Sequence, residues 1–163
     1  MFTRWYHKAH ACAFMSDLNS SGYKAMLKKY DGTTVNVTAS NCKAMLYMAD
    51  TLKNPRTWGK TDYMSMGGVM FGDGNTPPTV DDFQLSGDHF TTYSSSVTHT
   101  YDPDANEATV TYTLTNTGST DFTIREVGGI CTSSAILAFR EVLDSPVTIV
   151  AGGIGQVTIK IKT

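Results

Sequence analysis

Long apolar runs, metal-binding cysteine pairs and an excess of basic charge are all missing from this sequence of 163 residues. No apolar run approaches the roughly 20 residues that a membrane-spanning helix requires, so membrane insertion is not expected. The formal net charge is -2, from 13 basic and 15 acidic residues. Since no broad basic field is available to neutralise phosphates, the sequence does not favour a nucleic-acid partner.

The cysteines are few, odd in number and widely spaced: Cys12, Cys42 and Cys131. None has the C-x-x-C spacing of a zinc ribbon or a redox site. Buried, reduced thiols are therefore preferred over disulfides, as in a protein made in a cytosol. Charged and histidine residues interrupt the first 15 residues, so export by a signal peptide is not expected.

What the sequence does contain is typical of β structure. Hydrophobic residues make up 40% and charged residues 17%, and threonine, serine and glycine are frequent. The composition changes near residue 66, where Met, Lys and Cys give way to Thr, Val and Ile. We therefore expect an N-terminal helix and hairpin region in residues 1–66, containing a possible docking segment, and a β-sandwich domain in residues 67–163.

Alternation of apolar and polar residues predicts antiparallel strands after residue 90. It occurs in residues 97–101, 109–115, 122–126 and 157–161. Turn sequences separate these segments, and a further short strand is expected just before the last turn. Residues 136–143 are apolar on both faces except for Arg140 and Glu141, which predicts a central strand. The pattern indicates a mainly β fold, an antiparallel Ig-like or jelly-roll-like sandwich.

The first part of the chain predicts a helix and a hairpin. Aromatic residues and alanines at helical spacing in residues 2–13 indicate a short amphipathic helix. Asp31-Gly32, between two alternating segments, predicts a tight hairpin turn with positive φ at both positions. Residues 43–53 fit a helix better than a strand, and Pro55 ends that element.

One loop, between residues 67 and 87, combines glycines, prolines and acids in a way that raises the question of a site. Asp81 and Asp82 are adjacent, so in an extended segment they point in opposite directions and cannot flank one sugar ring. One is expected to cap a turn while the other is solvated. The loop is interpreted as a rigid connector, and its residues of interest are Gly72, Asp73, Gly74, Pro77, Pro78, Asp81 and Asp82.

Ligand-binding motifs in this loop are incomplete. Its oxygen-bearing residues miss the calcium-loop spacing D-x-[DN]-x-[DN]-G and the acidic residue at position twelve, so at most an incidental cation is expected. Pro77 replaces the third glycine of G-x-G-x-x-G, and Asp73 repels an anion. No cofactor and no metal site is predicted.

Catalytic motifs are missing too, because no G-x-S-x-G nucleophile elbow occurs. Glu126 and Arg140 are charged residues within apolar strands, and we interpret them as a buried or half-buried ion pair between neighbouring strands that specifies register. Trp5, Tyr6 and Phe14, with nearby methionines, either form an interface with neighbouring subunits or complete the core.

Three segments in order carry a resemblance to a known group of proteins. They are FGDGNTPPTVDDFQLSG (71–87), TNTGSTDFTIREVG (115–128) and ILAFREVLDSPVTIVAG (136–152). This order resembles small structural proteins of tailed bacteriophages, in which a GTGTTPPTxxDxxL-like loop precedes strands with TNTG, I-x-E-[IV]-G and L-x-R-x-V-L-x-x-P-V-T-V. The similarity covers roughly residues 67–163. The chain departs from the group at Asp73, Gly129 and Ile130.

The resemblance implies a virion component of the tail, neck or collar, or capsid surface, assembled in the host bacterial cytoplasm and without enzymatic activity. Its partners would be other virion proteins and further copies of itself. An alternative is a carbohydrate- or receptor-binding module of a phage fibre or tail tip. A glycosidase or peptidase that attacks the host surface ranks below both.

Overall fold

Strand β5 (Glu107–Asn116) forms where the sequence alternates most strictly. In the computed structural model, which describes residues 1–17, 24–38, 68–131 and 136–162, Val110, Tyr112 and Leu114 are buried while the threonines between them are partly exposed. β5 pairs antiparallel with β4 (Tyr93–Asp102) and with β8 (Ile154–Lys162). The predicted facing of residues in β5 is therefore confirmed, and the three strands form one sheet in the order β4-β5-β8.

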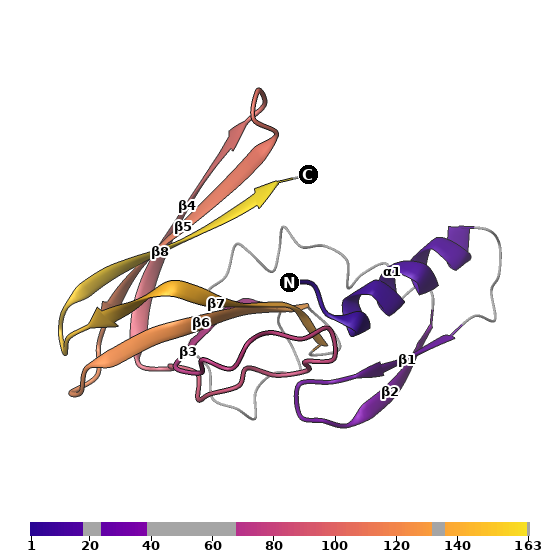
Figure 1. Cartoon of the computed structure of the whole chain (residues 1–163), viewed down its shortest axis with the longest axis horizontal. Helices are drawn as coiled ribbons and strands as arrows, with labels where there is room; N and C mark the ends of the chain where they lie inside the picture. Colours follow the sequence, from indigo (N-terminus) through magenta and orange to yellow (C-terminus); the bar gives the residue numbers. More distant parts are fainter. Residues whose placement is uncertain (18–23, 39–67, 132–135, 163) are drawn as a thin grey trace.

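A second antiparallel sheet has the order β3-β6-β7. Its strands are β3 (Gly68–Gly72), β6 (Phe122–Cys131) and β7 (Ile136–Ile149). The two sheets face each other at one end and diverge at the other, where the β4–β5 hairpin extends away from the second sheet (Figure 1). The mainly β, antiparallel, sandwich-like fold predicted from the sequence is confirmed.

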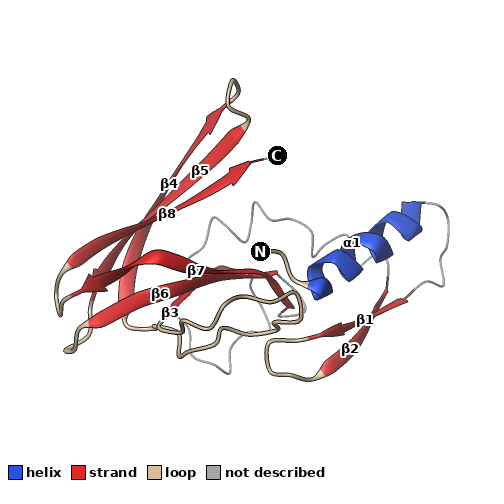
Figure 2. Ribbon diagram, viewed as in Figure 1, coloured by secondary structure: helices blue, strands red, loops and turns tan. Residues whose placement is uncertain are grey.

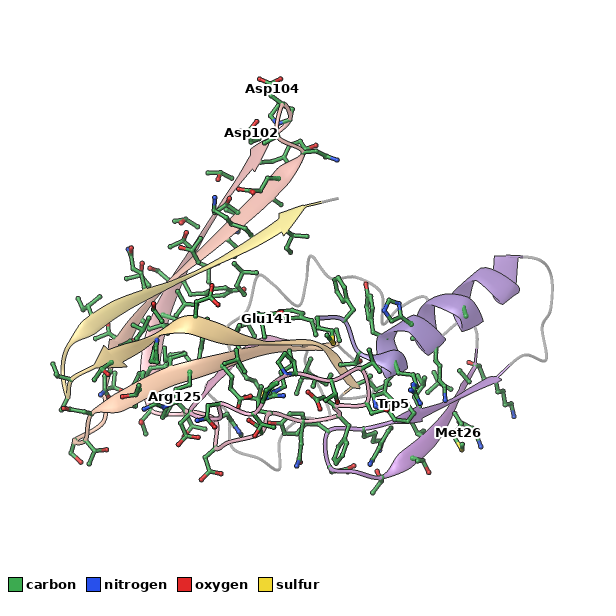
Figure 3. All side chains as sticks on the ribbon, in the orientation of Figure 1. Trp5, Met26, Asp102, Asp104, Arg125 and Glu141 are labelled. Atoms are coloured by element: carbon green, nitrogen blue, oxygen red, sulfur yellow. The ribbon has the colours of Figure 1, made fainter. Side chains whose placement is uncertain are left out.

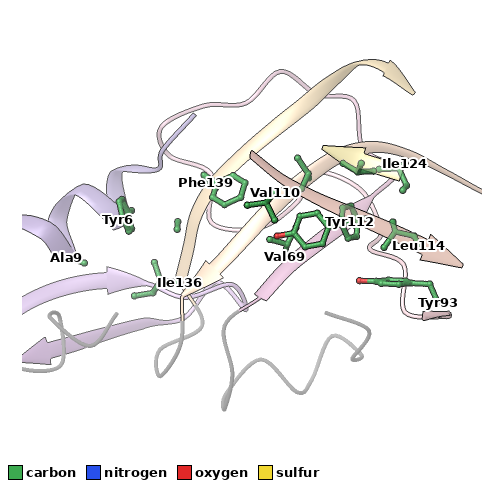
Figure 4. Packing of buried hydrophobic residues seen from close by; sticks show 14 of the residues in the cluster. Tyr6, Ala9, Val69, Tyr93, Val110, Tyr112, Leu114, Ile124, Ile136 and Phe139 are labelled. Atoms are coloured by element: carbon green, nitrogen blue, oxygen red, sulfur yellow. The ribbon is translucent and has the colours of Figure 1, made fainter. Parts of the chain in front are cut away.

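The main core lies between the sheets and continues beneath the N-terminal helix (Figure 4). Phe71 packs edge-on against Tyr93 and Tyr112, with ring centroids 5.9 and 5.4 Å apart. Tyr6 from the helix and Leu27 from the first hairpin belong to the same buried cluster. Side chains from the first part of the chain and from the sandwich thus share one core.

A smaller core covers the opposite face of the β3-β6-β7 sheet. It contains Tyr30, Met70, Leu85, Ile130 and Leu137. Leu85 comes from the connection between β3 and β4, so this loop itself covers the sheet. Because the sheet is buried on both faces, all five residues of β3 are buried and β7 begins with five buried residues.

The position of β7 differs from the prediction of a central strand. β6 lies in the centre, and β7 is the last strand of its sheet. The other edge of β7 is paired with residues 1–3: Phe2 forms an isolated bridge with Phe139, and the N–H of Thr3 donates to the carbonyl of Ala138. This pairing, together with burial on both faces, accounts for the apolar sequence that suggested a central strand.

β7 is also longer than predicted, because the expected separate strand near residue 148 continues it. Ile124 of β6 pairs with Val147 and Glu126 pairs with Val142, so two steps on β6 match five on β7. The extra residues form a bulge that includes Pro146, which cannot donate a ladder hydrogen bond. The bulge allows one strand to run through a position where the sequence indicated a break.

The N-terminal helix and hairpin form as predicted in kind (Figure 2). Helix α1 spans Arg4–Asp17, and Thr3 caps it, because its hydroxyl accepts the N–H of Tyr6 at 3.3 Å. β1 (Lys24–Lys28) pairs antiparallel with β2 (Thr34–Thr38).

The turn of this hairpin is not the two-residue turn expected from Asp31-Gly32. The N–H of Gly32 donates to the carbonyl of Lys29, and the N–H of Lys29 donates to the carbonyl of Thr33. Only Gly32 has positive φ, at 84°, so the connection is a three-residue loop ending in a left-handed glycine. Asp31 has ordinary φ, and its carboxylate accepts the N–H of Thr33 at 2.8 Å.

The element predicted for residues 43–53 lies outside the described residues. Across the described segments, no helix has the length and apolarity needed to span a membrane.

Candidate functional site

Glu126 and Arg140 form an ion pair beneath the β3–β4 loop. The Nε of Arg140 donates to Oε2 of Glu126 at 2.6 Å, and the two side chains are 2% and 0% exposed. The residues lie diagonally on β6 and β7, since Gly128 is the residue paired with Arg140. Neither charge is accessible to water, so each depends on protein partners for its hydrogen bonds.

A strand irregularity decides which way Glu126 points. Alternation in the sequence places it on the same face as Phe122 and Ile124, which belong to the core between the sheets. The register shift between Ile124 and Glu126 reverses this facing, so that Val127 enters that core instead. Glu126 consequently turns to the opposite face, toward the loop.

The Glu126 carboxylate binds backbone groups of the loop. Oε1 accepts the N–H of Gly74 at 3.2 Å and of Gly87 at 2.8 Å, and Oε2 accepts the N–H of Ser86 at 3.1 Å. These three donors come from both ends of the loop. One buried side chain therefore joins the two ends where β3 leaves and β4 approaches.

The Arg140 guanidinium reaches the middle of the same loop. Nη1 donates to Oδ2 of Asp82 at 2.7 Å, and Nη2 donates to the carbonyl of Thr76 at 2.6 Å and to Oγ of Ser86 at 2.7 Å. Burial opposes its charge, but the hydrogen bonds that it donates to Asp82 and Glu126 outweigh burial and raise the pKa of Arg140. The arginine is thus a permanent cation with partners on three sides.

Asp81 and Asp82 have different partners, as expected for adjacent residues in an extended segment. Asp82 accepts the N–H of Thr79 at 3.0 Å, which closes a turn, and also binds Arg140. Burial raises its pKa, but the bonds from Thr79 and Arg140 outweigh burial and leave the pKa of Asp82 below its usual value. Asp81 is exposed and binds the exposed Arg4 at 3.0 Å.

The other loop residues hold the connection in shape. Oδ1 of Asp73 accepts the N–H of Asp88 at 2.8 Å, and the N–H of Asp73 donates to the carbonyl of Asp88 at 3.1 Å. Pro77 and Pro78 lie in the segment without regular structure between Thr76 and the Thr79 turn. The ends of the loop are therefore tied to one another as well as to the sheet.

Gly72 and Gly74 lie at positions of the loop where no side chain fits. Neither has φ in the left-handed region. A Cβ on Gly74 would collide with Oγ of Ser86 and with Oε1 of Glu126, and a Cβ on Gly72 would meet Leu85 at 2.9 Å. These positions need glycine because side chains approach the backbone closely.

Chemically, the arrangement is a hydrogen-bonded anchor. Four bonds engage the Arg140 guanidinium, and the carboxylates of Glu126 and Asp82 are saturated by loop donors. Within residues 1–17, 24–38, 68–131 and 136–162, no group of three His, Cys, Asp or Glu side chains has a geometry that could hold a metal ion.

An apolar groove of about 320 Å³ lies beside β8, where the two sheets diverge. Phe139 and Leu143 of β7 line one wall, Ile159 and Ile161 of β8 line the other, and Phe2 closes one side. Phe2 is 39% exposed. The groove is open to solvent and separate from the Arg140 anchor, which lies under the opposite face of the β3-β6-β7 sheet.

Of the aromatic residues considered as an interface, Tyr6 lies inside the molecule. It is 7% exposed and stacks on Phe2 with 5.1 Å between ring centroids. Trp5 is partly buried, and its Nε1 donates to the carbonyl of Asp81 at 3.4 Å. Phe14 belongs to α1, but its side chain lies outside the described residues, as do those of the three cysteines.

Sequence reasoning missed the partners that the loop supplies to the ion pair. Thr76 and Ser86 carry no motif, and Asp82 was expected only to cap a turn or to be solvated. The useful signal was hydrogen-bonding capacity: a buried guanidinium has five N–H donors and one carboxylate cannot satisfy them. A polar loop next to the strand was the available source of acceptors.

Comparisons with family models, curated proteins and solved structures find no match to this chain.

Proposed function

We propose that the protein is a non-enzymatic structural component of a tailed-phage virion, a tail, neck or capsid-surface protein that acts by assembling with other proteins. The observation that carries the proposal is that one charged residue from each of the three phage-like segments takes part in the same ion-pair cluster. The Asp of the loop pattern is Asp82, the Glu of the I-x-E-[IV]-G pattern is Glu126 and the Arg of the third pattern is Arg140. Arg140 binds both of these acids.

The contacts of Arg140 with Asp82 and Glu126 give the three sequence patterns a physical basis. Each pattern contributes one residue to the same anchor, so the three segments form a single structural unit. The resemblance to phage structural proteins therefore rests on a connected feature rather than on three separate short matches. That supports membership of the group, from which the virion role follows.

Two further features support an assembly role. The charged groups of the loop are occupied with holding the backbone, which leaves little for acid–base chemistry. The apolar groove beside β8 presents Phe2 and Leu143 at an opening to solvent, and exposed apolar surface of this kind is typical of contact sites between proteins.

Mass spectrometry of purified particles of the phage that encodes the chain, with microscopic localisation of a tagged copy, tests the proposal. We expect a fixed copy number per particle and labelling of one substructure. Absence from particles purified to constant composition would overturn the assignment.

A separate assay addresses catalysis. The purified chain is incubated with host-surface glycans and with peptide substrates, and no turnover is expected. Turnover that disappears in a folded Asp82→Asn variant would contradict the non-enzymatic role, because Asp82 is the partly exposed carboxylate of the anchor.

The alternative of a carbohydrate-binding module has one observation in its favour. A polar cavity of about 610 Å³ lies between the first hairpin and the loop, lined among others by Asp31, Gln84 and Asp88. These groups match the hydroxyls of a sugar, but Tyr30, its aromatic residue, is only 5% exposed and offers no open stacking face. Specific glycan-array binding that is lost in Gln84→Ala would favour this alternative.

A further inference from the structure

The outer face of β1 carries a basic patch, which we define as Lys24, Met26 and Lys28. Ala25 and Leu27 point into the core, so the three patch residues face outward. Met26 is 58% exposed and lies between the two lysines near one extremity of the molecule (Figure 3). Their cross-strand partners on β2 are neutral: Thr38, Asn36 and Thr34.

Contacts with the rest of the protein restrict the positions of the patch residues. Nζ of Lys28 lies 3.6 Å from the ring centroid of Phe83, a cation–π contact that restricts this side chain. Main-chain pairing to β2 holds all three residues on one face of a strand. The patch is therefore a defined surface, in which two positive charges flank an apolar side chain.

A second extremity carries the opposite charge. The end of the β4–β5 hairpin presents an acidic tip, which we define as Tyr101, Asp102 and Asp104 (Figure 3). Tyr101 is 62% exposed. Oδ1 of Asp102 accepts the N–H groups of Asp104 and Ala105, at 2.9 and 3.1 Å, so the turn is ordered. Neither acid of the tip pairs with a cation of the described part of the chain, whereas neighbouring Glu107 binds Lys160 at 2.9 Å.

These local patches reflect an uneven charge along the chain. Residues 1–66 hold nine of the 13 basic residues, and residues 67–163 hold 11 of the 15 acidic residues. The net charge of -2 conceals this separation. In an assembly, like ends of such a chain repel and unlike ends attract.

We propose that the acidic tip of one copy docks on the basic patch of the next copy. The two surfaces have the same plan with opposite sign: an exposed apolar residue beside two like charges. Tyr101 would contact Met26, a favourable aromatic–thioether pair, while Asp102 and Asp104 approach Lys24 and Lys28. This inference rests on the proposed assembly function, for which it names one contact.

The contact is head-to-tail, because the acidic tip and the basic patch are different surfaces at two extremities of the molecule. Such heterologous contacts form a ring when the rotation closes and a filament when it does not. The tip is small, so a single contact lies at the low end of interface areas, below about 1,200 Å². We expect weak association in solution, strengthened where several copies are held together.

A second copy fits these observations better than an outside partner. Two lysines are too few for the multiple phosphate contacts that nucleic-acid binding requires. An unrelated acidic protein would account for the basic patch but would leave the acidic tip unexplained. Self-assembly accounts for the basic patch and the acidic tip together.

Sedimentation velocity of the full chain, over a range of concentrations, tests the contact with two charge-reversal variants. One is Lys24→Glu/Lys28→Glu and the other is Asp102→Lys/Asp104→Lys. The unmodified chain is expected to form species larger than dimers at low salt and to dissociate near 1 M salt, where charges are screened beyond about 3 Å. Each variant alone should remain monomeric up to concentrations about tenfold higher than those at which the unmodified chain associates. This shift corresponds to a loss of roughly 1.4 kcal/mol of binding free energy.

Mixing the variants gives the decisive result. Each variant carries one sign of charge on both surfaces, so in a mixture the original and the sign-reversed contacts both form between unlike variants. The two variants should therefore alternate in species larger than dimers. A chain carrying all four reversals should associate again, because the complementarity is restored with opposite sign. The control Arg125→Glu/Asp144→Lys changes exposed charges outside both surfaces and should assemble like the unmodified chain.

Several outcomes would overturn the inference: a chain that stays monomeric at low salt, variants that assemble normally, or a mixture of folded variants that does not interact. Circular dichroism verifies folding, and Lys24→Glu/Met26→Asp serves in place of the first variant if loss of Lys28 from Phe83 unfolds it. Failure of the proposed function is distinguishable. If the chain self-assembles as described but is absent from particles, the contact is supported and the virion role is overturned. If the chain is monomeric but present in particles, the virion role is supported and the contact is overturned.

Discussion

Arg140 and Glu126 are bound to each other across 2.6 Å, and each also holds a different part of the loop between β3 and β4. Glu126 binds the two ends of the loop, and Arg140 binds its middle. A buried pair by itself adds little net stability, because desolvation offsets the attraction. The backbone groups that these two side chains satisfy are what make the pair necessary for this fold.

Replacing Arg140 by methionine should be strongly destabilising. The change preserves much of the side-chain volume but leaves Glu126 buried without its counter-charge, which reduces the free energy of unfolding by about 3–5 kcal/mol. Urea denaturation at neutral pH measures the loss. Arg125→Met is the matched control, since Arg125 is exposed on β6 and should cost no more than about 0.5 kcal/mol. Equal effects of the two substitutions would contradict the anchor.

An apolar replacement of the whole pair distinguishes the anchor from a simple ion pair. If the pair only set the strand register, Arg140→Met/Glu126→Leu would be close to neutral. Here the double variant still leaves the N–H groups of Gly74, Ser86 and Gly87 without acceptors, at about 1–3 kcal/mol for each group that water does not reach. We expect a net loss of several kcal/mol in urea denaturation. Recovery of full stability would show that the loop does not depend on Glu126.

Asp81 and Asp82 should differ despite being neighbours. Asp82→Ala removes a charge-assisted bond from Arg140 and the acceptor of the Thr79 turn, for a loss of about 1.5–3 kcal/mol. Asp81→Ala removes an exposed pair with Arg4, which contributes less than about 1 kcal/mol. Thermal unfolding of both variants under one condition makes the comparison. A larger effect at Asp81 would disprove the assignment.

The lowered pKa of Asp82 predicts a dependence of stability on acidity. Because the folded pKa lies below the unfolded value of about 3.9, the folded state favours the ionised form. Its stabilisation is fully present above the unfolded pKa and is lost as pH falls through the folded pKa. Between pH 7 and about pH 3, the free energy of unfolding should therefore fall more in the unmodified chain than in Asp82→Asn. Parallel pH profiles for the two proteins would rule out the effect.

Gly87 should tolerate no side chain. A Cβ there would collide with Oδ1 of Asp73 and with the backbone of Gly74, which cannot move without breaking the bonds to Glu126. Gly87→Ala should lose about 1–3 kcal/mol or more. Gly152→Ala is a useful contrast, since nothing lies within 4 Å of the added Cβ and only its φ of 74° opposes the change, at about 1–2 kcal/mol. Differential scanning calorimetry ranks the two, and a greater loss at Gly152 would contradict the close-packed loop.

Much of the fold follows from local pattern. The facing of Val110, Tyr112 and Leu114, the N-terminal helix and the first hairpin were all predictable, because alternation and helical spacing reflect burial directly. The prediction of β7 as a central strand was wrong, because an apolar sequence on both faces of a strand has more than one possible cause. β7 is apolar on both faces although it is the last strand of its sheet, since the loop covers one face and residues 1–3 pair with its edge.

For the candidate site, the sequence by itself determined that Glu126 and Arg140 are charges within apolar strands, that adjacent Asp81 and Asp82 point apart, and that the chain is rich in strand-forming alternation. Only the tertiary structure decided that Glu126 faces the loop, because the register shift between Ile124 and Glu126 interrupts the alternation and places Val127 in the core instead. It also decided that Asp82, Thr76 and Ser86 are the partners of Arg140. Such contacts join residues more than 50 positions apart, and no local pattern encodes which polar loop will meet a buried guanidinium.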